Sequence, residues 1–395
     1  MTASRPTRVL QVVDSLGMGG AETWLIEVLK YFAQTKKYEI DFFATSGKRG
    51  ILDDEAEALG ATIYYGRFGR AHLGSFTRKF RKVLSEGCYD AIHDHADYAS
   101  GIHFLLALGR LPPVRITHIH NTWLHIEANY GISWARKLTA RIGKFFIRRI
   151  TTHVCGTSSD VLRLYGFPIQ SDKEPLTFVL HCGFDVGRFN APREPDRASV
   201  IKEFGWNESA RIVLFAGRLD RALECDHPQN QKNSWLALNV LRSVAEKDKS
   251  VCFLMAGAGD AQRLEMQKHI TSWGLSDRLR LIGIRKDLPR LMRASDMLFF
   301  PSRQEGLGMV AVEAQAVGLP VLASDGVPVA ANIIPQLYRS LPVRSSIAEW
   351  TDAVLATLNT PKVPLEIARR VIERSKFSIE TSAQQLTKIY DLYRS

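Results

Sequence analysis

The sequence predicts an α/β protein of two doubly wound, parallel-sheet domains. Three observations predict this fold. Short apolar runs typical of buried strands alternate with longer segments of helical period along the chain. The pattern stops at a polar, proline-rich stretch, residues 188–196, and then starts again. The length of 395 residues suits two domains of about 150–200 residues, each with a core of its own.

The first predicted domain covers residues 1–190 and contains seven strand-like runs. Helical segments separate most of them, and this order favours a parallel sheet because parallel neighbours need crossover connections. The predicted helices are 21–34, 51–59, 75–85 and 132–148. The predicted strands are 8–16, 39–45, 61–66, 89–95, 115–122, 152–158 and 176–183.

The second predicted domain covers residues 197–375, after a linker at 188–196. Its predicted strands are 211–219, 251–259, 279–283, 297–300 and 321–324, and its helices are 234–246, 260–272 and 309–317. The last segment, 376–395, has one apolar helical face, Ile379, Leu386, Ile389, Tyr390 and Tyr393. We expect it to be a helix that packs back on the first domain.

Composition favours a soluble cytoplasmic protein. Hydrophobic residues make up 45% and charged residues 24% of the chain, and no apolar run approaches the roughly 20 residues of a membrane span. The start shows no secretory apolar region. The five cysteines (88, 155, 182, 225 and 252) lack CxxC spacing, which argues against a disulfide framework or a zinc knuckle.

The formal charge of +11 comes partly from two basic clusters. Residues 75–84 and 134–149 mix Lys and Arg with large apolar side chains. Such helices suit an anionic membrane surface, and the protein is then expected at the inner face of the cytoplasmic membrane. The alternative is an ordinary amphipathic helix with a solvated basic side. No nucleic-acid-binding motif accompanies the charge.

Two glutamates in an apolar setting are the strongest candidate site residues. Glu305 lies on a predicted strand-to-helix turn with the flexible Gly306 and Gly308, and Glu313 lies about two helical turns further on. Backbone N–H groups at the helix start suit phosphate or sugar oxygens, and carboxylates accept hydrogen bonds from hydroxyl groups. A nucleotide sugar would satisfy both. The alternative is a turn cap and a solvated helix position.

Cations and histidines stand at other predicted strand ends, and one cation, Lys232, stands at the start of the next predicted helix. Arg218 and Lys232 suit a diphosphate, although two surface cations are the alternative. The His pairs of "HDH" (93–95) and "THIHNT" (117–122) show no obvious third metal ligand, so we expect no metal there. We expect His120 to donate a hydrogen bond to substrate, and His93 and His118 to be structural. No DxD triplet that would hold a metal against a diphosphate is found.

A glycine loop, "LGMGGAE" (16–22), follows the first predicted strand. It departs from G-x-G-x-x-G because Glu22 stands where the last glycine would be. A dinucleotide site is therefore weakly supported, although Gly19 and Gly20 permit close approach of an anion.

Taken together, the chain resembles retaining GT-B glycosyltransferases of family 4 (glycosyltransferase group 1), in particular those of bacterial exopolysaccharide and capsule biosynthesis. The resemblance covers nearly the whole chain. It rests on "GMGGAE", "YDAIHDHADYASG", "VRITHIHNT", "LHCGFDVGRF", "FAGRL…KN" and above all "LIGIRKDLPRLMRASDMLFFPSRQEGLGMVAVEAQAVGLPVLASD". It implies two Rossmann-like domains facing each other across a cleft, the first for the acceptor and the second for a nucleoside-diphosphate sugar.

The resemblance also implies roles for single residues. Glu313 would bind the ribose, and Glu305 with the N–H groups of Gly306, Leu307 and Gly308 would hold the donor sugar. Arg218 and Lys232 would neutralise the diphosphate, with Gly19 and Gly20 close to it. His120 would contact the sugar, and Ile284 and Arg285 would lie near the base. No cofactor or metal is expected, and the acceptor would be a glycan or a polyprenyl-linked sugar.

Two departures from the family pattern leave alternatives open. The segment 221–231 lengthens the usual spacing between Arg218 and Lys232, so Arg221 is an alternative second cation. After "SDGVP" the chain has "VAAN", where many members carry a glutamate. Rival functions on the same fold are a nucleotide-sugar epimerase, a glycoside phosphorylase and a non-catalytic nucleotide-sugar-binding protein.

Overall fold

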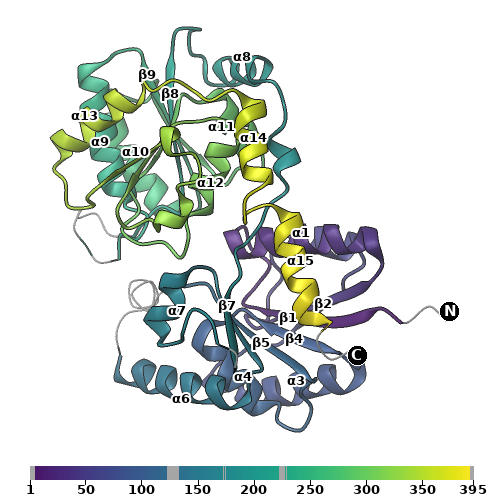
Figure 1. Cartoon of the computed structure of the whole chain (residues 1–395). Coiled ribbons are helices and arrows are strands. Elements are labelled where there is room, and N and C mark those ends of the chain that lie inside the picture. Colours follow the sequence, from purple (N-terminus) through teal and green to yellow (C-terminus); the bar gives the residue numbers. More distant parts are fainter. Residues whose placement is uncertain are drawn as a thin grey trace. The chain divides into compact units, whose positions relative to one another are not determined.

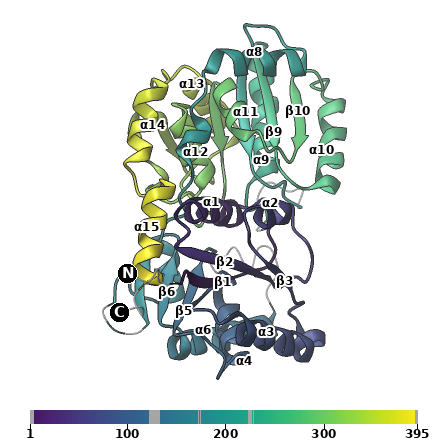
Figure 2. The same ribbon diagram turned by 90° about the vertical axis from the view of Figure 1, so that its right-hand side faces the viewer.

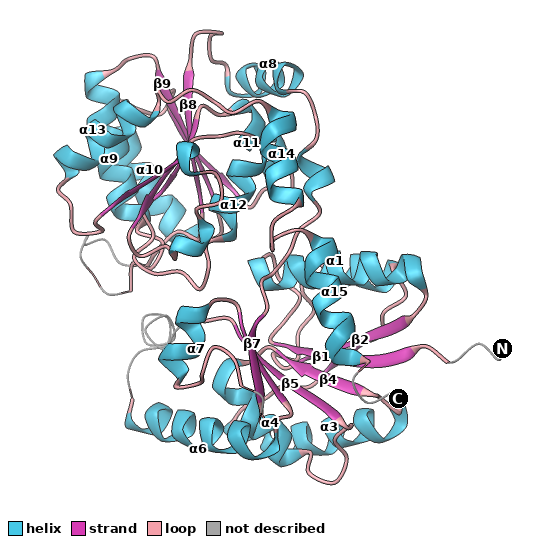
Figure 3. Cartoon of the chain, in the orientation of Figure 1, coloured by secondary structure: helices cyan, strands magenta, loops and turns pink. Residues whose placement is uncertain are grey.

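The computed structural model divides the chain into two compact units, each described by itself (Figure 1). It describes residues 5–121, 133–171, 173, 175–221, 227 and 229–391. Unit 1 holds the described residues up to Phe184 and from Lys376 onward, and unit 2 holds those from Asp185 to Ser375. Both units are parallel α/β sheets with helices on both faces, drawn as cyan helices around magenta strands in Figure 3.

Unit 1 contains a seven-stranded sheet in the order β3-β2-β1-β4-β5-β6-β7, with every pair of neighbours parallel. The helices α3, α4 and α6 line one face of the sheet, and α1 and α2 line the other (Figure 2). The strands are β1 (Thr7–Val13), β2 (Tyr38–Ala44), β3 (Ile63–Tyr65), β4 (Ala91–Asp94), β5 (Val114–Ile119), β6 (His153–Gly156) and β7 (Leu176–Val179). The helices are α1 (Gly20–Thr35), α2 (Asp53–Ala58), α3 (Leu73–Gly87), α4 (Ser100–Leu106), α6 (Trp134–Ile150), α7 (Ser159–Tyr165) and α15 (Ile379–Tyr390).

The C-terminal helix α15 lies beside α1, although the two are separated by most of the chain (Figure 1). Its apolar side chains Leu386, Ile389 and Tyr390 are buried. The indole Nε1 of Trp24 on α1 donates a hydrogen bond of 2.8 Å to Ser382 Oγ on α15. The helical face predicted from the sequence therefore packs on unit 1, except for Tyr393, which lies outside the described residues.

Unit 2 contains a six-stranded parallel sheet in the order β10-β9-β8-β11-β12-β13. The strands are β8 (Arg211–Ala216), β9 (Val251–Ala256), β10 (Leu279–Gly283), β11 (Met297–Phe300), β12 (Val321–Ser324) and β13 (Tyr338–Leu341). The helices are α8 (Arg193–Phe204), α9 (Ser234–Lys247), α10 (Asp260–Ser272), α11 (Leu288–Ala294), α12 (Met309–Ala316), α13 (Ile347–Thr357) and α14 (Leu365–Glu373).

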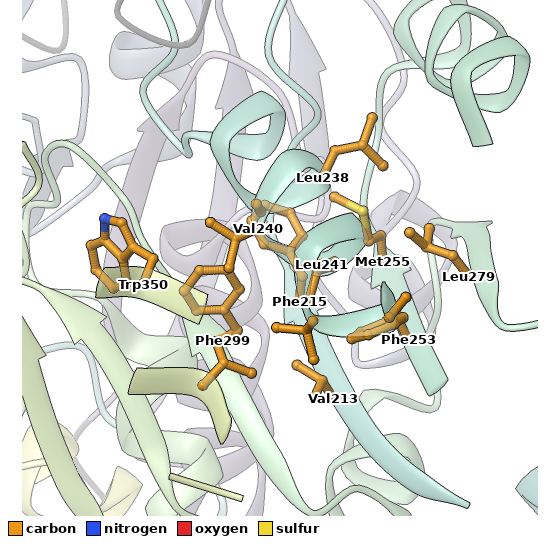
Figure 4. Close-up of a cluster of buried hydrophobic side chains, with 14 of the residues drawn as sticks. Val213, Phe215, Leu238, Val240, Leu241, Phe253, Met255, Leu279, Phe299 and Trp350 are labelled. Atoms are coloured by element: carbon orange, nitrogen blue, oxygen red, sulfur yellow. The ribbon is translucent and has the colours of Figure 1, made fainter. Parts of the chain in front are cut away.

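The core of unit 2 explains why its strands read as continuous apolar runs. Helices cover both faces of the sheet, so successive residues of β9 and β11 are buried whichever way they point. Figure 4 shows Phe215, Phe253 and Met255 from the sheet packed with Leu238 and Leu241 of α9. Burying each such side chain stabilises the fold by about 1.5–3 kcal/mol.

The predicted linker at 188–196 is wrong in its second half, because α8 begins at Arg193 with Pro192 as its N-cap. Proline is tolerated in the first helical turn, where its missing N–H would have no partner within the helix. Arg193 and Arg197 of this helix pair with Asp296, at 2.7 and 3.1 Å. The segment is therefore attached to unit 2.

Besides α8, six elements were not predicted at all: the helices α4, α7, α11, α13 and α14 and the strand β13. The helices α4 and α7 have seven residues each, too few for the helical period to stand out from the sequence. The described cysteines Cys88, Cys155, Cys182 and Cys252 are free thiols, in agreement with the expectation that no disulfide framework exists. Cys225 lies outside the described residues.

Candidate functional site

The residues of unit 2 that are predicted to bind phosphate and sugar lie together at the carboxyl ends of β8 and β11. These strands are hydrogen-bonded neighbours, although β9 and β10 lie between them in sequence. Arg218 follows β8 and Glu305 follows β11. The sheet runs outward in both directions from this pair, and in open α/β sheets such a switch point is where ligands bind.

Lys232 and Glu305 form an ion pair. The distance from Lys232 Nζ to Glu305 Oε1 is 2.5 Å, and the two side chains are only 21% and 9% exposed. Arg221, the alternative cation, is exposed at the start of the segment 222–226, which lies outside the described residues. The structure thus places Lys232, rather than Arg221, against Glu305, the residue predicted to hold the sugar.

Asp220, which sequence reasoning missed, holds Lys232 in place. Its buried carboxylate accepts hydrogen bonds from the backbone N–H groups of Lys232 and Ser234, at 3.1 and 2.8 Å. It therefore caps α9 from the loop after β8, although the preceding residue, Asn233, is the formal N-cap. Burial raises the pKa of Asp220, and the N–H groups of Ser234 and Lys232 oppose that rise.

Gln231 is a second residue that the sequence did not single out. Its side chain accepts a hydrogen bond from Arg218 Nη2 at 3.2 Å and donates one to the carbonyl oxygen of Gln304 at 3.2 Å. Its own carbonyl oxygen accepts from the N–H of Arg303 at 2.8 Å. Buried at the centre of these contacts, Gln231 ties Arg218 to the loop that carries Glu305.

The loop from Glu305 to Gly308 presents backbone donors. The N–H of Glu305 is bonded to the carbonyl oxygen of Gly326 at 3.0 Å, whereas the N–H groups of residues 306–308 have no acceptor among the described residues. Gly308 has φ +85°, and a Cβ there would lie 2.8 Å from Val327 Cγ1. Only glycine fits this position, which directs the chain into α12.

Glu313, on α12, carries a partly buried carboxylate that forms no hydrogen bond or ion pair with any described residue. Burial raises its pKa to about 7, and the nearby charge of Arg188 opposes that rise. A buried carboxyl group without partners destabilises the fold unless a ligand supplies them.

Ile284 and Arg285 follow β10 at the same edge of the unit 2 sheet. Arg285 is already paired with Asp287 and Glu203, at 2.7 and 2.8 Å. The half-exposed Ile284 and the backbone are the parts of this loop left for a ligand.

Gly19 and Gly20 begin α1 in unit 1, after β1. A Cβ on Gly19 would lie 2.2 Å from Glu22 Oε2, the end of a flexible side chain that can move aside. A Cβ on Gly20 would meet nothing within 4 Å. Packing within unit 1 therefore does not explain this glycine, and the close approach of a ligand stays a prediction.

His120 belongs to a cluster of four histidines at the ends of β4 and β5. The Nε2 atom of His120 is 2.8 Å from His95 Nδ1, and the ring centroids of His118 and His120 are 4.1 Å apart. Burial lowers the pKa of His120 to about 3 and lowers those of His93, His95 and His118 well below their usual value. All four rings are therefore neutral at pH 7.

The expectation that no third histidine lies close enough for a metal is wrong, because nitrogens of His93, His95 and His118 lie within 4.8 Å of one another. Adjacent parallel strands bring the two His pairs together, which spacing within one strand could not reveal. Even so, both nitrogens of His95 are within 2.8 Å of other partners, His120 and Gln11. To hold a metal, His95 would have to give up one of these two contacts.

The two basic clusters differ in what they bury. In α3 the large apolar residues Phe76, Phe80, Val83 and Leu84 are buried, so this is the ordinary amphipathic helix. In α6 the buried residues are Ala140, Gly143 and Ile147, which pack closely on α4. Its large apolar side chains are exposed: Trp134 at 78%, Phe145 at 51%, Leu138 at 48% and Ile142 at 40%. None of the described helices has both the length and the apolar character of a membrane span.

Two family models match successive parts of the chain. The model described as Glycosyltransferase Family 4 matches residues 18–188, and the model described as Glycosyl transferases group 1 matches residues 196–376. The first match ends, and the second begins, close to the division between the two units.

Curated relatives match over nearly their full length. EpsF of Bacillus subtilis (strain 168), which is named as a glycosyltransferase, is 26% identical over 98% of this chain and 97% of its own. The capsular polysaccharide biosynthesis glycosyltransferase CapH of Staphylococcus aureus is 24% identical over 97% of this chain and 98% of its own.

Solved structures share the fold. Anabaena Alr3699/HepE in complex with UDP and glucose has a TM-score of 0.73 at 18% identity, covering 97% of this chain and 99% of that chain. WaaG, a glycosyltransferase involved in lipopolysaccharide biosynthesis, has a TM-score of 0.71 at 15% identity, covering 96% and 99%.

Proposed function

Because the chain belongs to the glycosyltransferases that combine a family 4 domain with a group 1 domain in the GT-B fold, we propose that it is a retaining, metal-independent member. It would move a sugar from a nucleoside-diphosphate sugar to a glycan or lipid-linked acceptor in cell-surface polysaccharide biosynthesis. The relative named for capsular polysaccharide biosynthesis supports this setting.

The observation that carries the donor assignment is the partly buried carboxylate of Glu313 at the edge of the unit 2 sheet, which has no hydrogen-bond partner in the described part of the chain. Ribose hydroxyls would donate to it and so satisfy the group that destabilises the ligand-free protein. The same edge supplies Arg218, Lys232 and, just before α12, three N–H groups that have no acceptor among the described residues. Carboxylate, cations and backbone donors together match a ribose, a diphosphate and a sugar.

Lys232 would act on the leaving diphosphate while it stays fixed by Glu305. An ammonium group has three N–H donors, so Lys232 can keep its 2.5 Å contact with Glu305 and still reach a phosphate oxygen. Arg218, held by Gln231, would add a second cation. As the bond from the sugar C1 to the phosphate oxygen breaks, negative charge grows on the diphosphate, and these fixed cations stabilise it.

The proposal needs no protein nucleophile. The acceptor hydroxyl would attack C1 on the side from which the diphosphate leaves, its oxygen forming the new bond and its proton passing to a phosphate oxygen. The configuration at C1 is then retained. Because charge is stabilised by Arg218, Lys232 and backbone N–H groups, the proposal includes no metal ion.

Thermal melting in the presence of nucleotides tests the donor site. We expect one nucleoside diphosphate among UDP, GDP and ADP to raise the melting temperature, equally with and without EDTA. A ligand at 100 times its Kd adds about 2.7 kcal/mol to the free energy of unfolding. UDP is the first choice, since it is bound in the similar Anabaena structure. An EDTA-sensitive shift would contradict metal independence, and no shift would contradict the site.

We propose that α6 binds an anionic lipid surface. Its exposed stripe, Trp134, Leu138, Ile142 and Phe145, lies among the exposed Lys137, Arg141, Arg148 and Arg149. Inserted apolar side chains and basic residues, at about 1 kcal/mol per basic residue, both favour an anionic bilayer. The helix α3 adds only charge, because its apolar face is buried.

Vesicle flotation tests this surface. We expect binding to vesicles with anionic lipid but not to neutral vesicles, and Leu138→Glu to weaken it at least about tenfold by removing one inserted side chain and adding a repelled charge. Leu264→Glu, at the exposed Leu264 of α10 (66% exposed, against 48% for Leu138), is the control and should bind as the native protein does. Equal binding to neutral vesicles, or equal loss in both variants, would contradict the proposal.

A further inference from the structure

A chain of hydrogen bonds runs through unit 1 from the C-terminal helix to His120. The Nε2 atom of Gln11, on β1, donates to the hydroxyl oxygen of Tyr390, on α15, at 3.0 Å. The Oε1 atom of Gln11 is 2.8 Å from His95 Nε2, and His95 Nδ1 is 2.8 Å from His120 Nε2. The Tyr390 hydroxyl also lies 2.9 Å from His93 Nδ1.

The hydrogen bond between Gln11 and Tyr390 fixes which atom donates and which accepts in each of the following hydrogen bonds. Since the Gln11 amide nitrogen donates to Tyr390, its Oε1 faces His95 and can only accept. His95 Nε2 must therefore carry a hydrogen. A neutral imidazole has one N–H group, so His95 Nδ1 has a lone pair and accepts from His120 Nε2.

The same rule leaves His120 Nδ1 without a hydrogen. Burial keeps the pKa of His120 and that of His95 far below 7, so neither ring carries a second proton at neutral pH. No described residue is hydrogen-bonded to Nδ1, and this atom is not among the fully buried ones. The backbone of His120 is fixed separately, because its N–H donates to Asp97 Oδ1 at 2.8 Å.

We propose that Tyr390, Gln11 and His95 are positioning residues that hold His120 in the tautomer with its lone pair on Nδ1, so that His120 accepts a hydrogen bond from a sugar hydroxyl. This inference rests on the proposed function and on the contact between His120 and the sugar that the family resemblance implies. It reverses the direction expected from the sequence, in which His120 donates. It also gives the C-terminal helix a role in the chemistry of the site.

The packing of α15 on unit 1 does not depend on this series of hydrogen bonds. The helix is already attached by the bond from Trp24 Nε1 to Ser382 Oγ and by its buried apolar face. Tyr38 makes a comparable hydroxyl contact, 2.9 Å to Asp391 Oδ1 at the end of α15, but has no hydrogen bond to the histidines. Tyr38→Phe is therefore a matched control for Tyr390→Phe.

Nitrogen NMR of the full-length protein labelled with ¹⁵N-histidine tests the tautomer directly. The His120 signals are assigned by their loss in His120→Gln. We expect a pyridine-type shift at Nδ1 and a pyrrole-type shift at Nε2 in the native protein. The opposite pair of shifts would overturn the proposal.

The variants test the positioning role. In Tyr390→Phe the Gln11 amide loses the acceptor that orients it, so we expect mixed His120 tautomers. We expect kcat/KM to fall about threefold to tenfold, as for the loss of one hydrogen bond. Tyr38→Phe should keep the native tautomer and activity within twofold. Equal losses in both variants, or a native tautomer in Tyr390→Phe, would overturn the positioning role.

A third variant separates the inference from the proposed function. Suppose that His120→Ala transfers sugar at the native rate while the native protein shows the expected tautomer. The role of His120 at the sugar then fails, but the assigned donors and acceptors of the hydrogen bonds stand. If His120→Ala is strongly impaired but the tautomer is reversed, the role at the sugar stands and this inference fails.

Discussion

Replacing Glu305 by alanine will lower kcat for sugar transfer by about 100- to 1,000-fold, the loss typical when one group that stabilises transition-state charge is removed. The physical reason is the ion pair with Lys232, at 2.5 Å and largely out of water. Without the carboxylate, the Lys232 ammonium is no longer held where the leaving diphosphate gains charge. Transfer kinetics and calorimetric binding of the nucleoside diphosphate, measured side by side, check this prediction.

Binding of the diphosphate alone should survive in Glu305→Ala, because Lys232 keeps its charge. Glu305→Gln removes the charge but keeps the shape of the side chain, and its kcat should lie between those of the native protein and the alanine variant. Gln304→Ala, in the neighbouring position of the same loop, should transfer normally, since the contact of Gln304 with Gln231 uses its backbone oxygen. Native transfer by Glu305→Ala would remove the central residue of the proposed site.

Replacing Glu313 by glutamine will weaken nucleotide binding by about 10- to 100-fold at pH 8 and remove a pH dependence that the native protein shows. Ribose hydroxyls need the ionised carboxylate as acceptor. Because burial raises the pKa of Glu313 to about 7, most of the free protein at pH 6 carries the protonated form. We therefore expect binding of the native protein to be about tenfold weaker at pH 6 than at pH 8. Calorimetric titration across this range measures it.

The glutamine variant supplies the control for titration of the nucleotide phosphates, which affects both proteins alike. Only the difference between the pH profiles of nucleotide binding of the native protein and of Glu313→Gln is due to ionisation of Glu313. Glu208→Gln, at an exposed glutamate of unit 2, should match the native profile. Identical profiles for Glu313→Gln and the native protein would contradict the ribose assignment.

The stability of the ligand-free protein is a second measure of the ionisation of Glu313. The pKa of Glu313 is raised from 4.5 when unfolded to about 7 when folded, so the folded state binds more protons between these values. The free energy of unfolding then decreases as pH rises through this window, and is lowered by on the order of 1–3 kcal/mol above it. Glu313→Gln should lack this decrease in urea denaturation.

The sequence by itself determined the two parallel α/β domains and the helix that returns to the first of them. Long apolar runs such as β9 and β11 are buried on both faces of their sheets, and this burial leaves a continuous pattern that can be read locally. The residues at the carboxyl ends of strands, including Arg218, Glu305 and His120, could be picked out because chemical side chains follow directly after apolar runs. The linker was misplaced because Pro192 and Pro195, which usually mark a break, here stand at the start of a helix.

Only the tertiary structure decided which of these residues meet and in which state. Asp220, Gln231, Gln11 and Tyr390 have no distinctive sequence pattern, and each acts through a partner from another element. The two His pairs lie on neighbouring strands, so neither their clustering nor the direction of the hydrogen bonds through His95 could be derived from spacing within one strand. Burial of large side chains in α3 and their exposure in α6 could not be told apart either, because both helices have similar composition. Pairing, burial and proton position depend on contacts across the sheet, whereas the local period of a sequence reports only the element to which a residue belongs.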